Sequence, residues 1–254
     1  MHAVRNDGAM TVTPYFEQDG VTLYHGDCRE ILPTLDPGVV RAVVTDPPYC
    51  SGGFNEAGKK AAAGMGLRSE TVREVGWFVN DNMTTQGICW LLSFVAGWCR
   101  KVCKDGSTLT VFTDWRMVPA LAPAIEGAGW RYQNLIVWQK PNTGLGTGFR
   151  PCHELALHFS NGTPEYFATD GSNVINEKRV GTDERLHQTQ KPVGLMAEII
   201  RVTSAEGETI LDPFAGSGTT LLAARLEGRQ AVGIEISERY CEIAANRLRQ
   251  KLLF

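Results

Sequence analysis

Apolar runs alternate along the chain with amphipathic segments, in an order typical of an α/β fold. The clearest run, Val39–Thr45, is rich in β-branched residues, as parallel strands buried on both faces are. We therefore predict one doubly wound, mostly parallel, seven-stranded sheet with helices on both faces. Its strands are expected at Val21–Tyr24, Val39–Thr45, Ser107–Phe112, Arg131–Trp138, Glu154–Phe159, Thr209–Leu211 and Gln230–Glu235.

Apolar residues at helical spacing occupy most of the intervals between these expected strands. No helix separates Arg131–Trp138 from Glu154–Phe159, so these two strands should pair antiparallel. The apolar helix around Ile88–Trp98 could either pack inside the monomer or form a homodimer face. Helices are expected at Cys28–Leu35, Thr84–Cys103 with Lys104-Asp105-Gly106 as its stop, Trp115–Glu126, Val193–Ser204, Thr219–Gly228 and after an N-cap at Ser237.

The length and composition are those of a chain that can bury one hydrophobic core. It has 254 residues, 43% of them hydrophobic, which predicts a single domain over residues 1–254. No apolar run reaches the ~20 residues of a membrane span, and the first residues lack the apolar stretch of a secretory signal. We therefore expect a cytoplasmic protein without a membrane partner.

Neither the net charge nor the cysteine content indicates a binding partner by itself. The net charge is −3, so a nucleic-acid partner would need local basic patches. Two polar segments with such patches, Cys50–Gly76 and Ser160–Gln190, are long for passive loops. The seven cysteines contain no CxxC pair, and His153 and His158 should point to opposite faces of a strand, so no metal site is predicted.

A glycine motif follows the expected strand at Thr209–Leu211. Gly216-Ser217-Gly218 between a strand and a helix would let the backbone approach a ligand and aim amide groups at it. Glu235 ends the next strand, 17 residues after Gly218, where an acidic side chain can accept hydrogen bonds from both hydroxyls of a ribose. The motif lacks the third glycine of a dinucleotide fingerprint, so a ligand with one nucleoside fits better. The alternative is a plain tight turn with a surface glutamate.

A second motif, Asp46-Pro47-Pro48-Tyr49, follows the strand Val39–Thr45. The Asp46 carboxylate and the Pro47 carbonyl can both accept hydrogen bonds from an exocyclic NH₂, and Tyr49 can stack on a flat ring. Alone, two prolines after a strand are also a common strand stop.

Together and in this order, the two motifs resemble those of amino-group DNA methyltransferases that use S-adenosylmethionine (SAM), whose signatures are Asp-Pro-Pro-Tyr and Phe-x-Gly-x-Gly. The catalytic motif precedes the cofactor loop, as in the circularly permuted β class of that family. The resemblance runs from His25-Gly26-Asp27-Cys28 through Gln190-Lys191-Pro192 to Glu235. It implies a Rossmann-like sheet and methyl transfer from SAM to the amino group of a base flipped out of duplex DNA, which leaves S-adenosylhomocysteine.

The resemblance also assigns residues. Asp46, Pro47, Pro48 and Tyr49 would be catalytic, Asp27 would contact the cofactor adenine, and the Lys191-Pro192 pair would lie at the methionine end. Target recognition would fall within residues 140–190, shared with residues 50–76. The implied cofactor set is Asp27, Cys28, Asp46, Lys191, Pro192, Asp212, Phe214, Ala215, Gly216, Ser217, Gly218, Thr219, Thr220 and Glu235. The candidate DNA contacts are Lys59, Lys60, Arg68, Lys140, Lys178, Arg179 and Arg185.

Three alternatives stay open on sequence alone. In the resembled family, Asp in the place of Asp46 goes mostly with adenine N6 and Ser mostly with cytosine N4, so adenine is predicted and cytosine is the alternative. Protein glutamine methyltransferases use a similar Pro-Pro-Tyr motif, but after Asn and with the cofactor loop first in the chain. A SAM-binding DNA-recognition protein without catalysis would not need an intact Asp46 and Tyr49.

Overall fold

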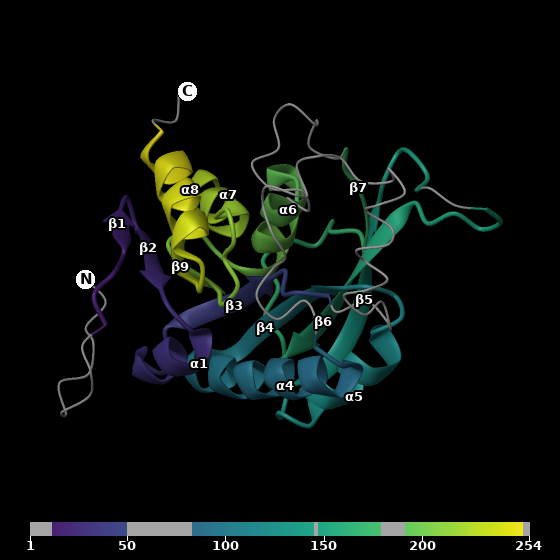
Figure 1. Ribbon diagram of the computed structural model, residues 1–254, viewed down its shortest axis with the longest axis horizontal. Coiled ribbons are helices and arrows are strands. Elements are labelled where there is room, and N and C mark those ends of the chain that lie inside the picture. Colours follow the sequence, from purple (N-terminus) through teal and green to yellow (C-terminus); the bar gives the residue numbers. More distant parts are fainter. Residues whose placement is uncertain (1–11, 50–82, 145–146, 179–190, 251–254) are drawn as a thin grey trace.

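The apolar runs form one mixed sheet at the centre of the molecule (Figure 1), and the computed structural model describes residues 12–49, 83–144, 147–178 and 191–250. Each of the seven predicted strands is present, but two short strands, β1 and β7, extend the edges, so the described sheet has nine strands in the order β1-β2-β9-β8-β3-β4-β6-β5-β7. The strands are β1 Phe16–Gln18, β2 Val21–His25, β3 Val40–Thr45, β4 Cys103–Thr113, β5 Arg131–Gln139, β6 His153–Ser160, β7 Val174–Asn176, β8 Thr209–Asp212 and β9 Gln230–Glu235.

Five central strands, β2, β9, β8, β3 and β4, run parallel. All six residues of β3 are buried, as expected for a strand covered on both faces. Strand β6 is antiparallel to both β4 and β5, which confirms the predicted pairing of β5 with β6. The N-terminal end of β6 therefore lies at the same sheet edge as the C-terminal ends of the parallel strands.

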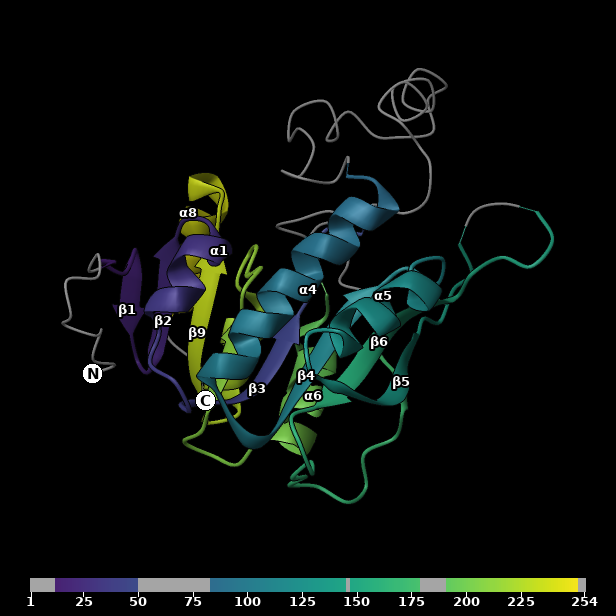
Figure 2. The same cartoon turned by 90° about the horizontal axis from the view of Figure 1, so that it is seen from below.

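Helices cover both faces of the sheet (Figures 1 and 2). Helices α6, α7 and α8 pack on one face, and α1, α4 and α5 pack on the other, so the sheet separates two apolar cores. No helix within the described residues is long and apolar enough to cross a membrane. The helices are α1 Cys28–Ile31, α4 Thr85–Val102, α5 Val118–Glu126, α6 Val193–Thr203, α7 Thr219–Leu226 and α8 Glu238–Arg249.

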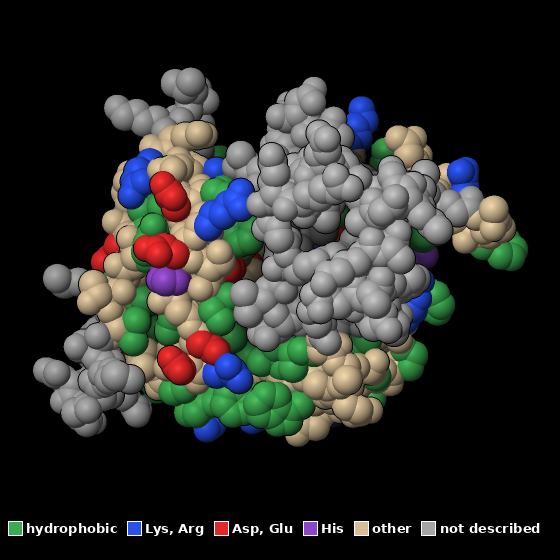
Figure 3. All heavy atoms as spheres, in the orientation of Figure 1, with side chains coloured by type: hydrophobic (Ala, Val, Ile, Leu, Met, Phe, Trp, Pro, Cys, Tyr) green, Lys and Arg blue, Asp and Glu red, His purple; other side chains and the backbone are tan. Residues whose placement is uncertain are grey.

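The apolar helix α4 packs inside the monomer with most of its apolar residues. Ile88, Leu92 and Val95 are buried in the core beneath the sheet. Trp90 and Phe94 instead stack on each other on the outer side, where Trp90 is 57% exposed. Apolar side chains also gather along this margin of the molecule in the space-filling view (Figure 3). A homodimer face stays a prediction.

Several details of the predicted elements differ from the structure; for example, the helix predicted at Trp115–Glu126 begins only at Val118. Lys104-Asp105-Gly106 does not separate the helix from the next strand, because β4 already begins at Cys103. Gly106, with a φ of 75°, allows the irregular start of this strand. The predicted helix Cys28–Leu35 changes to a 3₁₀ turn at Leu32–Thr34, where Pro33 lacks an amide hydrogen. Ser237 holds the N-cap position of α8, but its side chain makes no capping hydrogen bond.

Candidate active site

Strand ends bring the predicted motifs together at one edge of the sheet. The register pairs His25 with Glu235 and Asp212 with Gly233, so Asp27, Glu235 and Asp212 follow or end neighbouring strands. Asp46 follows β3, which pairs with β8 on one side and β4 on the other. This carboxyl edge is where open α/β sheets place their ligands.

The glycine turn between β8 and α7 has two glycines with separate tasks. Gly216 has a φ of 51°, and a Cβ placed there would meet nothing within 4 Å, so the backbone faces open space. Gly218 has a φ of 76°, and a Cβ there would lie 2.9 Å from the Cβ of Ala244 on α8. The first glycine therefore leaves room for a ligand, and the second allows close helix packing.

Carboxylates flank this turn. Glu235 Oε2 accepts a 2.8 Å hydrogen bond from the Gly216 amide, and Oε1 accepts one of 2.8 Å from the Ser237 amide. Burial raises the pKa of Glu235. Asp27 caps α1 and pairs with Arg29 at 2.6 Å, which lowers the pKa of Asp27. Each carboxylate oxygen has a second lone pair, so Glu235 can still accept hydrogen bonds from ribose hydroxyls.

The predicted catalytic motif, Asp46 to Tyr49, is held by a buried lysine. Lys191, immediately before α6, is 3% exposed and places Nζ 2.6 Å from Asp46 Oδ2 and 2.9 Å from the Tyr49 hydroxyl. Asp46 Oδ1 is buried and has no hydrogen-bond partner among the described residues. Burial raises the pKa of Asp46 even though Lys191 opposes the shift. One oxygen of Asp46 is therefore fixed, and the other is a buried acceptor that no described residue uses.

Two further charged residues complete this group and were not predicted as part of it. Glu154, on β6, places Oε2 3.1 Å from Lys191 Nζ and 3.3 Å from the Tyr49 hydroxyl, while its Oε1 pairs with Lys140. Burial works to raise the pKa of Glu154, but the two ammonium groups outweigh it and lower that pKa. We call Asp46, Tyr49, Lys140, Glu154 and Lys191 the lysine cluster.

Lys140, which was predicted to contact DNA, lies in the lysine cluster, and a DNA contact by this residue stays a prediction. Lys140 is only 7% exposed, and its ammonium lies 4.6 Å from the centre of the Trp138 ring as well as against Glu154. Electrostatic attraction to the buried Glu154 carboxylate and to the face of the Trp138 ring holds the Lys140 side chain inside the site. The Lys191 ammonium is also fully used inside the site, because three acceptors within 3.1 Å take its three protons.

The other predicted DNA contacts lie mostly outside the described residues. Lys178 belongs to the described residues. It lies two positions after the end of β7, and its side chain is exposed. Segment 50–76 and the residues Lys59, Lys60, Arg68, Arg179 and Arg185 fall outside the described part of the chain. Among described residues, no group of three or more His, Cys, Asp or Glu side chains converges on a metal position. His158 instead contacts the Thr110 and Tyr166 hydroxyls.

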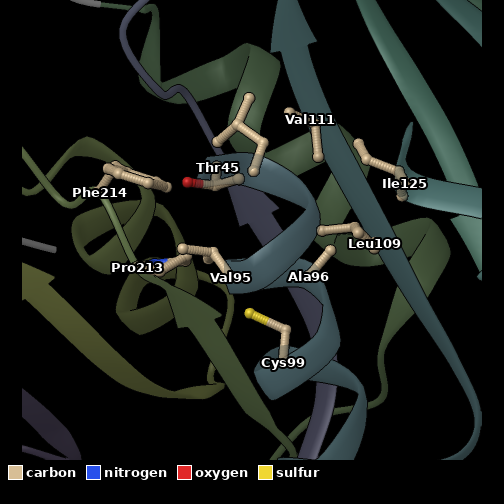
Figure 4. Close-up of a pocket in the computed structure, with 10 residues that line it drawn as sticks. Thr45, Val95, Ala96, Cys99, Leu109, Val111, Ile125, Pro213 and Phe214 are labelled. Atoms are coloured by element: carbon tan, nitrogen blue, oxygen red, sulfur yellow. The ribbon is translucent and has the colours of Figure 1, made fainter. Parts of the chain in front are cut away.

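A small apolar cavity lies below the glycine turn, between α4 and the ends of β3 and β4 (Figure 4). Val95, Cys99 and Phe214 are among its lining residues, and Thr45 supplies its one hydroxyl. That hydroxyl already donates to Asp212 at 2.7 Å. Among the described lining residues, the Cys99 thiol is therefore the one side-chain group left to orient a ligand, and a thiol is only a weak donor.

Comparison with known proteins gives consistent matches over most of the chain. A family model described as DNA methylase matches residues 40–246. The type II methyltransferase M2.DpnII of Streptococcus pneumoniae is 26% identical, with 95% of this chain and 94% of that protein covered. M.HinfI of Haemophilus influenzae, also a type II methyltransferase, is 26% identical, with 90% of this chain and 68% of that protein covered.

Two solved structures share the fold. The M1.HpyAVI–SAM complex aligns with a TM-score of 0.66 at 22% identity, covering 91% of this chain and 100% of that one. The PvuII DNA methyltransferase, described as cytosine-N4-specific, aligns with a TM-score of 0.74 at 16% identity, covering 96% of this chain and 91% of that one.

Proposed function

We propose, from the premise that the chain belongs to the DNA methylase family, that it methylates the N6 amino group of an adenine flipped out of duplex DNA, with SAM as the methyl donor. One observation carries this proposal above the others. Asp46 Oδ1 is a buried acceptor without a partner in the described part of the chain, directly after a central strand and three residues before the aromatic ring of Tyr49. An unpaired buried acceptor is costly, so a donor from the substrate is its natural partner.

The amino group would be held between two acceptors. Asp46 Oδ1 would accept one N–H, and the carbonyl of the buried Pro47 would accept the other. Both bonds favour a tetrahedral nitrogen, which frees a lone pair that is otherwise delocalised into the ring. Tyr49 would stack on the base, and the fixed hydroxyl of Tyr49 restricts where its ring can lie.

Bound SAM would supply a methyl group carried on a positively charged sulfur, which would keep the electron pair of the carbon–sulfur bond when the target nitrogen takes the methyl group. The methylated nitrogen then carries one proton too many. Asp46 Oδ1 would take that proton and later release it to solvent, while Lys191 keeps Oδ2 occupied. No cysteine and no covalent intermediate is needed.

The residues around the glycine turn fit SAM. The open space at Gly216 admits a ligand against the backbone, and Glu235 lies beside it to accept the ribose hydroxyls. Asp27, one strand further along, would lie at the adenine ring of SAM. These are neighbouring strand ends, so one nucleoside can span them.

Duplex DNA is the proposed partner, and the cytoplasm is the proposed location. Unstacking a base costs a few kcal/mol, which stacking on Tyr49 and phosphate contacts would offset. Lys178 is the described candidate for such a contact. We place further contacts in segments 50–76 and 160–190.

Adenine is preferred over cytosine because Asp46 begins the catalytic motif, and in the resembled family Asp there goes mostly with adenine N6. Purified protein would be incubated with SAM and unmethylated genomic DNA, and the nucleosides analysed by mass spectrometry. N6-methyladenine is expected, and N4-methylcytosine as the sole product would overturn the choice of base. SAM and DNA binding without any methylated base would favour a silent recognition protein.

A further inference from the structure

Asp46 and Glu154 share one buried cation. Lys191 Nζ lies 2.6 Å from Asp46 Oδ2 and 3.1 Å from Glu154 Oε2, and the Lys191 side chain is 3% exposed. Lys140 neutralises the other oxygen of Glu154. The lysine cluster therefore contains two positive and two negative groups. Lys191 pairs with both carboxylates and not with one alone.

Glu154 also fixes the orientation of the catalytic motif. The Tyr49 hydroxyl accepts from Lys191 at 2.9 Å and donates to Glu154 Oε2 at 3.3 Å. The Lys191 ammonium and the Tyr49 hydroxyl thus both bridge the catalytic motif to Glu154. Glu154 itself points no oxygen at Asp46 Oδ1, since both of its oxygens are occupied.

We propose that Glu154 is a positioning residue for methyl transfer: by drawing Lys191 and Tyr49 toward β6, it leaves Asp46 Oδ1 free to hold the target amino group and take its proton. This inference rests on the proposed function. Without the Glu154 charge, Lys191 would pair with Asp46 alone and withdraw electron density from the acceptor. The Tyr49 ring would also lose one of its two anchors.

The charges around Asp46 give this role a measurable signature. Lys191 acts on Asp46 from the segment that precedes α6, and Glu154 acts on it from β6. Tyr49 acts from the same loop as Asp46, and Asp212 lies near it on β8. Lys140 acts through Glu154. The negative charge of Glu154 contributes to raising the pKa of Asp46, so its removal should move the acid limb of the kcat profile to lower pH.

The test compares Glu154→Gln with wild type and with Glu208→Gln. Glu208 is a matched control because it also bridges two cations, Arg41 at 2.8 Å and Lys104 at 3.3 Å, but at the opposite edge of the sheet. Single-turnover methylation of unmethylated genomic DNA would be measured across pH. SAM affinity would be measured by calorimetry, and the free energy of unfolding by urea titration.

For Glu154→Gln we expect a fall in kcat of roughly tenfold to 100-fold, an acid limb lower by about one pH unit, and unchanged SAM affinity. Glu208→Gln should keep the wild-type kcat and profile. If Glu154→Gln does not fold, the double variant Glu154→Gln/Lys140→Met removes the outer ion pair together and should show the same two changes.

Several results would overturn the inference. One is a wild-type rate and profile in a folded Glu154 variant. Another is a lower rate with an unshifted acid limb and weaker SAM binding, which would indicate a structural role alone. A wild type that binds SAM and DNA but methylates nothing would overturn the proposed function and this inference with it.

Discussion

The Thr45 hydroxyl donates a 2.7 Å hydrogen bond to Asp212 Oδ1, and both side chains are buried. Thr45 is the last residue of β3, directly before Asp46, while Asp212 is the last residue of β8, before the glycine turn. Asp212 Oδ1 also accepts from the Phe214 amide of that turn at 3.1 Å. One oxygen atom thus joins the catalytic motif to the proposed cofactor turn.

The first prediction uses the pKa of Asp212, which burial raises to about 6. Because the folded state holds this proton more tightly than the unfolded state, Asp212 makes folding less favourable as pH rises from about 4 to about 6. Asp212→Asn keeps an acceptor for Thr45 and removes the buried charge. The variant should gain stability relative to wild type over this pH range, by up to about 3 kcal/mol. Urea unfolding at pH 4 and pH 7 tests this, and a difference that shrinks with rising pH would contradict it.

Asp46→Asn should abolish most of the methyl transfer. Lys191 would hold the amide oxygen, so the amide NH₂ would turn toward the substrate and oppose another donor. We expect kcat to fall about 10²-fold or more, with little change in SAM affinity. Radiolabelled methyl transfer and calorimetry measure the two quantities. Activity above a tenth of the wild-type value would remove Asp46 from the proposed role.

Glu235→Gln should act on binding. The variant loses one charged acceptor at the proposed ribose site, since its new NH₂ cannot accept from a hydroxyl or an amide. A lost hydrogen bond to a charged group is worth about 1.5–3 kcal/mol, so SAM should bind roughly tenfold to 100-fold more weakly. Unchanged affinity in calorimetry would show that the ribose does not lie there.

Lys191→Met should destabilise the fold in a pH-dependent way. It leaves the Asp46 and Glu154 carboxylates in a buried site that Lys140 alone cannot neutralise, which typically costs about 3–5 kcal/mol. The folded-state pKa of both groups would then rise, so the loss of stability should grow as pH rises from about 4 to about 7. Lys104→Met is the control: it removes a surface partner of Glu208 and should cost at most about 1 kcal/mol. Equal losses in the two variants would contradict the assignment.

Sequence reasoning found the edge of the sheet that carries the site, because the strands that define it are easily recognised. Val39–Thr45 is apolar and β-branched, and Asp46 and Glu235 come at the ends of such runs. Parallel strands place those ends together, whatever their separation in the chain. The edge strands β1 and β7 were missed because three residues are too few for a hydrophobic period.

The missed half of the lysine cluster depends on pairing that a single sequence does not reveal. Glu154 reaches Asp46 only because β6 pairs antiparallel with β4, which in turn pairs with β3. A signal was present nonetheless. Glu154 stands just before the apolar stretch Leu155-Ala156-Leu157, and a carboxylate next to a buried strand usually has a cation as partner. The same reasoning would have indicated Lys140 as a partner for that carboxylate.

The hairpin between β5 and β6 is closed at its base by the ion pair of Lys140 with Glu154 and by a 2.7 Å hydrogen bond from the Lys140 amide to the Cys152 carbonyl. The described residues beyond that base, 141–144 and 147–151, project away from the sheet (Figure 2). The charges of Lys140 and Glu154, which belong to the proposed reaction centre, are therefore anchored independently of the loop that connects them. A designer could exchange that loop for one of another length or composition, for instance to alter which DNA sequences are accepted, and leave the charges at the reaction centre in place.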